Sequence, residues 1–312
     1  MKRLWCYFVL LSSALLSLSL SSCRTINASG SSTTPVVLRY AFAPEEEQLQ
    51  GGSIRADLMQ AYLQKELHRP VEVIRVEGYA STIEAMRADK VDISTYGALG
   101  YIIAAQKGGA EAIVARGNPD GSLGGYRSMI AVPKNSPIHS MQDLKARAKD
   151  IVFSFSDPAS TSGNLYPRVG LLSMGINPEK DFKKVVFSGT HPATVLTVAA
   201  GKVDAGAFSA SVLPRLIALH KIAPNDLRIL WTSELIPNGP TAVRKGLPDQ
   251  LKKDIQAALL AIPTKDPELW SNIVNTYRTN TSGMSYVSVN DGTYNGLRSY
   301  TSKVKDFNFV DK

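Results

Sequence analysis

The sequence predicts an α/β protein built from two similar lobes. Strand-like apolar runs alternate with helical stretches along most of the chain, and one stretch of the first half is repeated in the second. The length of 312 residues, with 44% hydrophobic and 20% charged residues, suits two domains or lobes. A cleft between two such lobes is where a ligand commonly binds.

The first lobe is expected to open with alternating strands and helices. Residues 36–42 are largely apolar, and residues 71–76 alternate between apolar and polar, as half-buried strands do. Ile54, Leu58 and Leu63 recur at helical spacing between these two strands. Because strand and helix alternate, we expect mostly parallel sheet. The expected elements are strand 36–42, helix 53–67, strand 71–76, helix 81–88 and strand 91–94.

An internal repeat indicates that the two halves are related. Residues 77–92 align without gaps on residues 189–204, and each stretch ends in Lys-Val-Asp. Each is expected to form a strand end, a helix and the start of a strand. Few positions are identical, so two βαβ units that are similar by chance remain an alternative. The same place in the order of each half favours two related lobes.

Two lobes need segments that cross between them. Ile130–Pro137 is expected to be the outward crossing and Leu230–Pro237 the return. These crossings place residues 36–133 and 237–312 in the first lobe and residues 134–236 in the second. The C-terminal helices are expected at 247–261 and 267–277.

The N-terminus has the pattern of a secretory signal. Lys2 and Arg3 precede a mostly apolar stretch, Leu4–Leu20, and no stop-transfer pattern follows. Leu-Ser-Ser-Cys, ending at Cys23, resembles a bacterial lipobox. We therefore expect a lipoprotein signal peptide at 1–22 and lipidation of Cys23, with a plain signal peptide or a lone buried Cys as the alternatives. Lipid chains would hold the protein at a membrane.

A flexible tether is expected after the leader. Residues 23–35 follow the signal peptide and are rich in Ser, Thr, Asn and Gly. The other cysteine, Cys6, lies within the leader, so the mature chain has no pair for a disulfide.

Charge and histidine spacing narrow the functional classes. The formal charge is +8, from 35 Lys and Arg against 27 Asp and Glu, and the excess is spread along the chain. No basic run interleaved with aromatics occurs, so we do not expect nucleic acid binding. A mildly basic protein that handles anions is a better fit. The four histidines lack metal-ligand spacing, and neither a metal nor a cofactor is expected.

A Ser/Thr cluster at a strand-to-helix junction is the candidate anion site. The apolar strand Ile151–Phe155 leads into Asp157–Asn164, and a helical stretch follows with Tyr166 and Pro167 in its first turn. A helix start presents free N–H groups and a partial positive charge, which attract anions. The alternative is an ordinary Ser or Thr N-cap, for which one hydroxyl is enough.

Four segments of the chain carry a family resemblance. They are Lys90–Asp92 with Tyr96 and Gly97, Asp157–Gly163, Gly189–His191 and Ile236–Pro240. Together they resemble the substrate-binding proteins of phosphonate and phosphite ABC importers, and the resemblance runs from about Leu38 to the C-terminal helices. Family members resemble type II periplasmic binding proteins, in which two α/β lobes close over a ligand.

The resemblance implies roles for five residues. Ser160, Thr161 and Ser162 match the positions that hydrogen-bond the phosphonate oxygens. His191 matches a histidine that contacts the same group, and Tyr96 matches a tyrosine of the cleft. The chemistry agrees, because hydroxyls, backbone N–H groups and an imidazole N–H are the donors that a dianion needs.

The resemblance also implies partners and a location. We expect an extracytoplasmic lipoprotein, on the periplasmic or cell-surface side of a bacterial membrane, that delivers its ligand to an ABC transporter permease. Alternatives are a phosphate- or other phosphonate-binding protein of the same importer class, and a sensor lipoprotein that reuses the fold. An enzyme is not expected, because no Gly-x-Ser-x-Gly elbow surrounds Ser160 and so a Ser160–His191 hydrolase pair lacks its usual setting.

Two further positions bear on ligand choice. Members that take aminoethylphosphonate resemble one another in placing two carboxylates where they read the ammonium. The matching positions here are Ser211 and Gly239, and neither is charged. A buried ammonium without a counter-charge is costly, so phosphite or methylphosphonate is favoured. Phosphate needs an acceptor for its O–H, and the sequence does not tell whether Glu45 or Glu47 supplies one.

Overall fold

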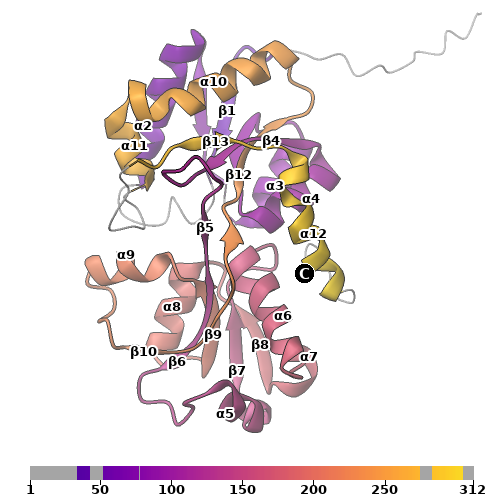
Figure 1. Ribbon diagram of the computed structural model, residues 1–312, viewed down its shortest axis with the longest axis vertical. Helices are drawn as coiled ribbons and strands as arrows, with labels where there is room; N and C mark the ends of the chain where they lie inside the picture. The colour runs from indigo at the N-terminus through magenta and orange to yellow at the C-terminus, as the bar shows by residue number, and fades with distance from the viewer. Residues whose placement is uncertain (1–33, 43–51, 77, 275–282, 305–312) are drawn as a thin grey trace, which may run out of the picture. The chain divides into compact units, whose positions relative to one another are not determined.

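The computed structural model describes residues 34–42, 52–76, 78–274 and 283–304. The leader with Cys23, most of the tether, and Glu45 and Glu47 lie outside the described residues, so the expectations on them stay predictions. The described chain forms a six-stranded sheet, a five-stranded sheet and a two-stranded ladder, with helices on both faces of the two large sheets (Figure 1). The α/β class is as predicted.

The six-stranded sheet has the strand order β13-β4-β12-β3-β1-β2. Its buried apolar side chains pack on one face against α2 and the C-terminal helices α10 and α11, and on the other against α3 and α4. The bounds are β1 Leu38–Ala41, α2 Gly52–Leu67, β2 Val71–Ile74, α3 Tyr79–Arg87, β3 Ile93–Thr95, α4 Ala98–Gly108, β4 Ala110–Arg116, β12 Pro240–Arg244, α10 Asp249–Lys265, α11 Pro267–Val274 and β13 Tyr286–Ser288.

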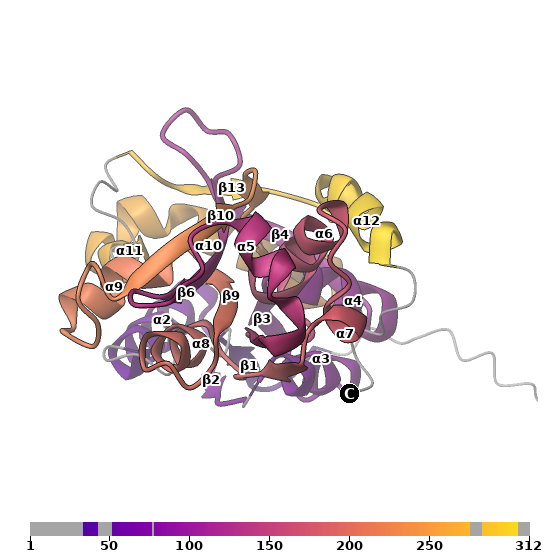
Figure 2. The same cartoon turned by 90° about the horizontal axis from the view of Figure 1, so that it is seen from below.

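The five-stranded sheet has the order β10-β6-β9-β7-β8. Helices α8 and α9 pack on one face, and α5 and α6 lie over the opposite face (Figure 2). The bounds are β6 Ser128–Pro133, α5 Met141–Ala146, η1 Ala148–Asp150, β7 Val152–Phe155, η2 Thr161–Leu165, α6 Tyr166–Ser173, α7 Pro178–Asp181, β8 Lys184–Phe187, α8 His191–Ala199, β9 Ala205–Ser209, α9 Val212–Ala218 and β10 Leu227–Thr232. The last described elements are η3 Asp291–Tyr294, α12 Asn295–Thr301 and η4 Ser302–Val304.

The sheets are mixed, and the expectation of mostly parallel sheet is wrong. β1 pairs in parallel with β2 and β3, and β7 pairs in parallel with β8 and β9. β12, however, runs antiparallel to both β3 and β4. β6 likewise runs antiparallel to β9 and β10. These antiparallel strands stand next to the ladder of β5 and β11, where the chain passes from one sheet to the other and back.

That ladder agrees with the end of the expected return, Leu230–Pro237, and differs in place from the expected outward crossing, Ile130–Pro137. β5 (Gly125–Tyr126) pairs antiparallel with β11 (Ile236–Pro237), just outside the five-stranded sheet. The first half of the expected outward crossing, Ile130–Pro133, belongs to β6 and lies within that sheet. Ile130 and Val132 are fully buried there, so an apolar run that suggested a crossing is a core strand.

The repeated Lys-Val-Asp ends have the same role in both sheets. The carboxylate of Asp92 accepts the N–H of Arg39 at 3.0 Å, and the N–H of Asp92 donates to the carbonyl of Arg39 at 2.9 Å. Asp204 repeats both bonds with Val152, at 2.7 and 3.0 Å. Each Asp thus ties the start of one strand to the strand beside it.

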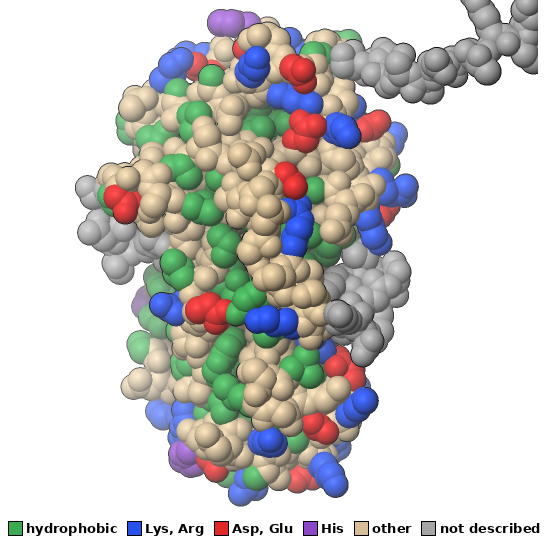
Figure 3. Space-filling view, turned by 45° about the vertical axis from the view of Figure 1, so that its right-hand side comes forward, with side chains coloured by type: hydrophobic (Ala, Val, Ile, Leu, Met, Phe, Trp, Pro, Cys, Tyr) green, Lys and Arg blue, Asp and Glu red, His purple; other side chains and the backbone are tan. Residues whose placement is uncertain are grey.

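Positively and negatively charged side chains are interspersed on the surface. On the face drawn in Figure 3, Lys and Arg side chains are interspersed with Asp and Glu, and no broad area of one sign forms. None of the described helices combines the length and apolar character needed to cross a membrane.

Candidate functional site

The predicted anion segment forms the first turns of a helix at the end of β7. Thr161–Leu165 makes a π-helical turn that runs directly into α6. Ser160 is the N-cap residue, and its hydroxyl accepts the N–H of Gly163 at 3.0 Å. Ser160 is therefore an ordinary N-cap residue, as the alternative prediction had it. The hydroxyls of Thr161 and Ser162 contact other parts of the chain.

Gly163 allows this turn to pack closely on its neighbours. A Cβ at this position would lie 2.4 Å from Ser156 Cβ and 2.8 Å from His191 Cε1. Real Cβ atoms do not approach so closely, so only glycine fits without displacing both residues. The glycine of the motif thereby brings the turn against His191.

His191 begins α8, whose N-cap hydroxyl comes from Thr190. Its Nδ1 lies 2.8 Å from Ser156 Oγ and accepts the N–H of Ser209 at 3.3 Å. Burial lowers the pKa of His191 to about 3, so the ring is neutral at physiological pH. Since Nδ1 accepts, we assign the proton to Nε2, which lies 3.2 Å from Ser162 Oγ.

Thr161 contacts a helix that belongs to the other sheet. Its Oγ1 accepts the N–H of Leu99, in the first turn of α4, at 2.9 Å. The N-cap of α4 is Gly97, which has no side chain to satisfy these amides, so Thr161 acts as the cap from a distant part of the chain. A Cβ on Gly97 would lie 3.4 Å from Thr161 Oγ1.

Three helix starts therefore meet at Thr161 and Ser162. They are the start of α4 through Leu99, the start of the η2–α6 helix itself, and the start of α8 through His191. Each helix start contributes a partial positive charge and N–H donors. The side chains of Ser160, Thr161, Ser162 and His191 are all buried. The partial positive charges of the helix starts are therefore screened only weakly by solvent.

Two tyrosines border the same place. Tyr96 directly precedes Gly97 and is buried, and its hydroxyl has no hydrogen-bond partner among the residues that the structure describes. Burial raises the pKa of Tyr96 above its usual value, against a smaller lowering by Ser94, so the phenol stays protonated and able to donate. Tyr79 begins α3, and its ring carbon Cε1 lies 3.8 Å from a Cβ placed on Gly97.

The sequence analysis did not predict several residues that form this site. Ser156 and Ser209 hold the His191 ring, and the Ser128 hydroxyl donates to the Ser162 carbonyl at 2.6 Å. Ser156 could have been found, because it stands at the carboxyl end of β7 next to the motif. Ser128 and the Leu99 amide meet the motif only through the fold.

Asp157 is the acidic residue of the motif itself. Its carboxylate accepts the N–H of Ala159 at 2.7 Å, which shapes the turn before Ser160. Burial raises the pKa of Asp157 to about 6. Within the described chain, no three Asp, Glu, His or Cys side chains gather as a metal site.

Comparison with known proteins identifies the family of the chain. The family model described as "ABC transporter, phosphonate, periplasmic substrate-binding protein" matches residues 40–279. The chain belongs to this family. Its members bind substrates for ABC transporters and are not enzymes, which confirms the prediction that the chain is a binding protein.

Individual members of the phosphonate-binding family show how far the likeness extends. The chain is 34% identical over 193 residues to the phosphonates-binding periplasmic protein of Escherichia coli, covering 62% of this chain and 56% of that one. It is 30% identical over 194 residues to the phosphate-import protein PhnD of Mycolicibacterium smegmatis, covering 59% of each. The chain thus matches less than two thirds of the length of both relatives.

A solved structure establishes the fold. PhnD1 from Prochlorococcus marinus, in complex with methylphosphonate, superposes with a TM-score of 0.73 at 23% identity and covers 87% of this chain and 99% of its own. The type II periplasmic binding protein fold that the sequence resemblance implied is confirmed.

Proposed function

We propose that the protein captures a small phosphorus oxyanion outside the cytoplasm and delivers it to the permease of an ABC importer, held at the membrane through lipidated Cys23. The observation that carries the proposal is the meeting of three helix starts at Thr161 and Ser162, beside the neutral His191. Such a place offers N–H and O–H donors to an anion.

The site draws on both predicted lobes. Thr161, Ser162 and His191 come from the lobe of residues 134–236, and Tyr96 and Leu99 come from the lobe of residues 36–133 and 237–312. We propose that the lobes close over the ligand, and that the bond between Thr161 and the Leu99 N–H at the start of α4 joins them in the closed form. A ligand that contacts both sides favours the closed form by its differential affinity.

The lack of space for a side chain at Gly239 favours a compact ligand without an ammonium group. A Cβ on Gly239 would lie 2.0 Å from the carbonyl oxygen of Tyr96, so no carboxylate side chain fits here on this backbone. Ser211 matches the other position at which some family members carry a carboxylate that contacts the ammonium. Here it is the uncharged N-cap residue of α9. Phosphite or methylphosphonate is therefore the favoured ligand, with phosphate below them and aminoethylphosphonate as the weakest.

The names of similar proteins include two of these candidate ligands. The relative in Mycolicibacterium smegmatis is a phosphate-import protein, and the Prochlorococcus marinus structure holds methylphosphonate. These names support a phosphorus oxyanion as the ligand class, and the order within the class rests on Gly239 and Ser211.

A calorimetric titration panel tests the proposal. The mature protein is titrated with phosphite, methylphosphonate, phosphate and aminoethylphosphonate, and phosphite or methylphosphonate is expected to bind tightest. His191→Gln should weaken that binding by about tenfold or more, the effect of a lost hydrogen bond to a charged group. His139→Gln, which changes an exposed histidine, is the matched control. Tightest binding by aminoethylphosphonate, or no binding of any of the four, would overturn the proposal.

A further inference from the structure

A buried arginine lies behind the Ser/Thr segment of the oxyanion site. Arg168 belongs to α6, which follows directly on the π-helical turn Thr161–Leu165, and only 1% of its surface is exposed. Arginine is almost never buried to this extent unless its charge is paired and its N–H groups are bonded. The contacts of Arg168 therefore show what its burial serves.

Arg168 contacts the chain at both ends of the Ser/Thr segment. On the N-terminal side its guanidinium carbon lies 4.4 Å from the centre of the Phe155 ring, at the end of β7. On the C-terminal side its Nε donates to Asn164 Oδ1 at 3.1 Å. The stretch between Phe155 and Asn164 contains the hydroxyls of Ser160, Thr161 and Ser162. One side chain thus joins the two ends of the stretch that carries these donors.

Asn164 connects Arg168 with the turn before Ser160. Its Nδ2 donates to the carbonyl of Pro158 at 2.7 Å, so the side-chain amide is bonded through both its oxygen and its nitrogen. Arginine only donates and the Pro158 carbonyl only accepts, so the amide fits in a single orientation. The two bonds together hold the turn at 157–160 against the π-helical turn.

The π-helical turn is where such support matters most. Turns of this kind are rare and occur mostly singly, at functional sites. Here the N–H of Leu165 donates to the carbonyl of Ser160, five residues earlier, at 3.1 Å. In this turn the Thr161 hydroxyl reaches α4 and the Ser162 hydroxyl reaches His191. An α-helical turn has one residue fewer and would rotate both hydroxyls about the helix axis.

Glu179 fixes the far end of the arginine. It belongs to α7, which lies beside α6 (Figure 1), and its carboxylate pairs with Arg168 Nη1. Burial lowers the pKa of Arg168, and the Glu179 carboxylate counteracts part of this effect, so the guanidinium stays charged. Phe155, Asn164 and Glu179 therefore hold Arg168 in one place. A side chain held in this way can keep a neighbouring binding segment in its productive geometry.

We propose that Arg168 is a positioning residue of the oxyanion site, which acts through Asn164 to hold the hydroxyls of Thr161 and Ser162 where they bind the ligand. The inference rests on the proposed function, because it concerns the same site. Arg168 contacts the segment from behind and makes no bond to the ligand itself. Loss of Arg168 should therefore weaken the binding of phosphite and of methylphosphonate by a similar factor.

A double-mutant cycle tests whether Arg168 acts through Asn164. Calorimetric titration with phosphite compares the parent, Arg168→Met, Asn164→Leu and the double variant. Each single variant should bind phosphite about tenfold more weakly, the scale of one lost hydrogen bond to a charged group. The double variant should bind no more weakly than the weaker single variant, because the two residues belong to one chain of contacts. Losses that multiply to about a hundredfold would mean that the two residues act independently, and would overturn the proposal.

Arg228→Met is the matched control. Arg228 belongs to the same predicted lobe and donates to three backbone carbonyls, those of Lys134, Ser136 and Ile138. Its substitution should lower stability and leave phosphite affinity at the parental value. Urea unfolding of every variant shows that each is folded under the conditions of the titration.

A measurement without ligand reports the position of the Ser162 hydroxyl directly. This hydroxyl lies 3.2 Å from His191 Nε2, so the NMR signals of the His191 ring respond when it moves. The signals should shift in Arg168→Met and stay at their parental positions in Arg228→Met. Arg168→Lys keeps the charge beside Glu179 without the guanidinium fork, so it should shift them less, and it replaces Arg168→Met in the cycle if that variant does not fold.

The two proposals fail in different ways. Parental phosphite affinity in folded Arg168→Met and Asn164→Leu, or unchanged His191 ring signals in Arg168→Met, refutes the positioning role alone. A parent that binds neither phosphite nor methylphosphonate refutes the proposed function instead.

Discussion

The buried neutral state of His191 leads to a sharp prediction about acid stability. The folded protein holds this imidazole at a pKa of about 3, because burial disfavours the charged ring. In the unfolded chain the pKa returns to the ordinary value of 6.5. Between these two values the unfolded chain binds a proton that the folded chain does not. The free energy of unfolding therefore decreases as the pH falls through 6.5 toward 3.

The magnitude follows from the two pKa values. At about pH 4.5 the unfolded histidine is almost fully protonated and the folded one is almost fully neutral. Each unit of pH below the unfolded pKa then costs about 1.4 kcal/mol, so His191 lowers the free energy of unfolding by about 3 kcal/mol between about pH 7.5 and about pH 4.5. Since a domain is stable by only about 5–15 kcal/mol, the effect is large enough to measure.

Urea unfolding of the parent and of His191→Gln, without ligand, isolates this contribution. Glutamine does not titrate, and the pH dependence of all other groups cancels in the difference between the two proteins. The stability advantage of the parent should shrink by about 3 kcal/mol from about pH 7.5 to about pH 4.5. His139→Gln controls for the substitution itself. A parent-to-variant difference that stays constant within about 0.5 kcal/mol across this range would refute a buried, neutral His191.

Two further substitutions test the neighbouring groups. Asp157→Asn should stabilise the protein by about 3 kcal/mol near pH 7.5 and by little near pH 4, because burial raises the pKa of Asp157 from 3.8 to about 6. Between these two pKa values the unfolded chain releases a proton that the folded chain keeps, so the cost of the buried carboxyl group grows from pH 4 and is complete above pH 6. Urea unfolding at both pH values checks it, and a gain that is equal at both would contradict it. Thr161→Val should lower the free energy of unfolding by about 1–3 kcal/mol and weaken phosphite binding, since the buried N–H of Leu99 loses its acceptor. Thr161→Ser keeps the hydroxyl and is the control, and a Val variant as stable as the Ser variant would show that the contact with α4 contributes nothing.

The neutral ring also changes how the site is understood. A protonated imidazole would attract an anion by charge, whereas the neutral ring of His191 offers a single directed N–H donor near Ser162. The positive potential then comes from the helix starts and not from a titrating side chain. If the proposed anion binds here, we expect its affinity near neutral pH to follow the ionisation of the ligand and not that of His191.

Local patterns predicted the elements that hydrogen-bond mainly within themselves or with near neighbours. The alternation of strand and helix was correct, and α2 begins within one residue of its expected start. The ends of strands were less accurate, since β1 covers Leu38–Ala41 and not all of residues 36–42. Apolar character extends past the last ladder bond, so periodicity alone overestimates strand length.

The internal repeat reflects a shared structural role, although few of its positions are identical. Asp92 and Asp204 each bind both backbone groups of a residue on the adjacent strand, which explains why an acid is needed at the end of both copies. The buried Asp92 also pairs with Arg39 and Arg244, at 2.9 and 3.1 Å. Among the described residues, no arginine forms such a pair with Asp204. The backbone role is shared by the two halves, and the ionic role belongs to the first.

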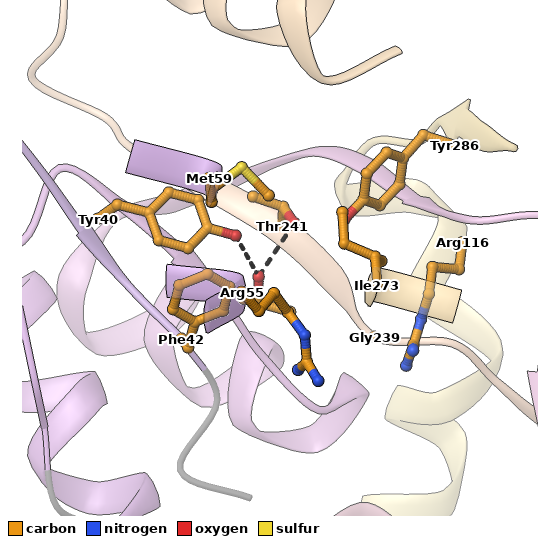
Figure 4. Close-up of a pocket in the computed structure, with 10 residues that line it drawn as sticks. Tyr40, Phe42, Arg55, Met59, Arg116, Gly239, Thr241, Ile273 and Tyr286 are labelled. Atoms are coloured by element: carbon orange, nitrogen blue, oxygen red, sulfur yellow. Dashed lines mark hydrogen bonds between the residues drawn. The ribbon is translucent and has the colours of Figure 1, made fainter. Parts of the chain in front are cut away.

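The pocket lined by Tyr40, Thr95, Gly239 and Thr241 could not be predicted from the sequence (Figure 4). Tyr40, Thr95 and Thr241 are far apart in the chain, and only the order β12-β3-β1 places their hydroxyls in one row. β12 reaches this position because the chain returns from the other sheet and inserts antiparallel beside β3 and β4. Gly239 precedes β12, so the residue that admits no side chain at the Tyr96–Gly97 peptide is fixed by the same return. The position of these side chains therefore depends on strand order, which composition and motif spacing do not encode.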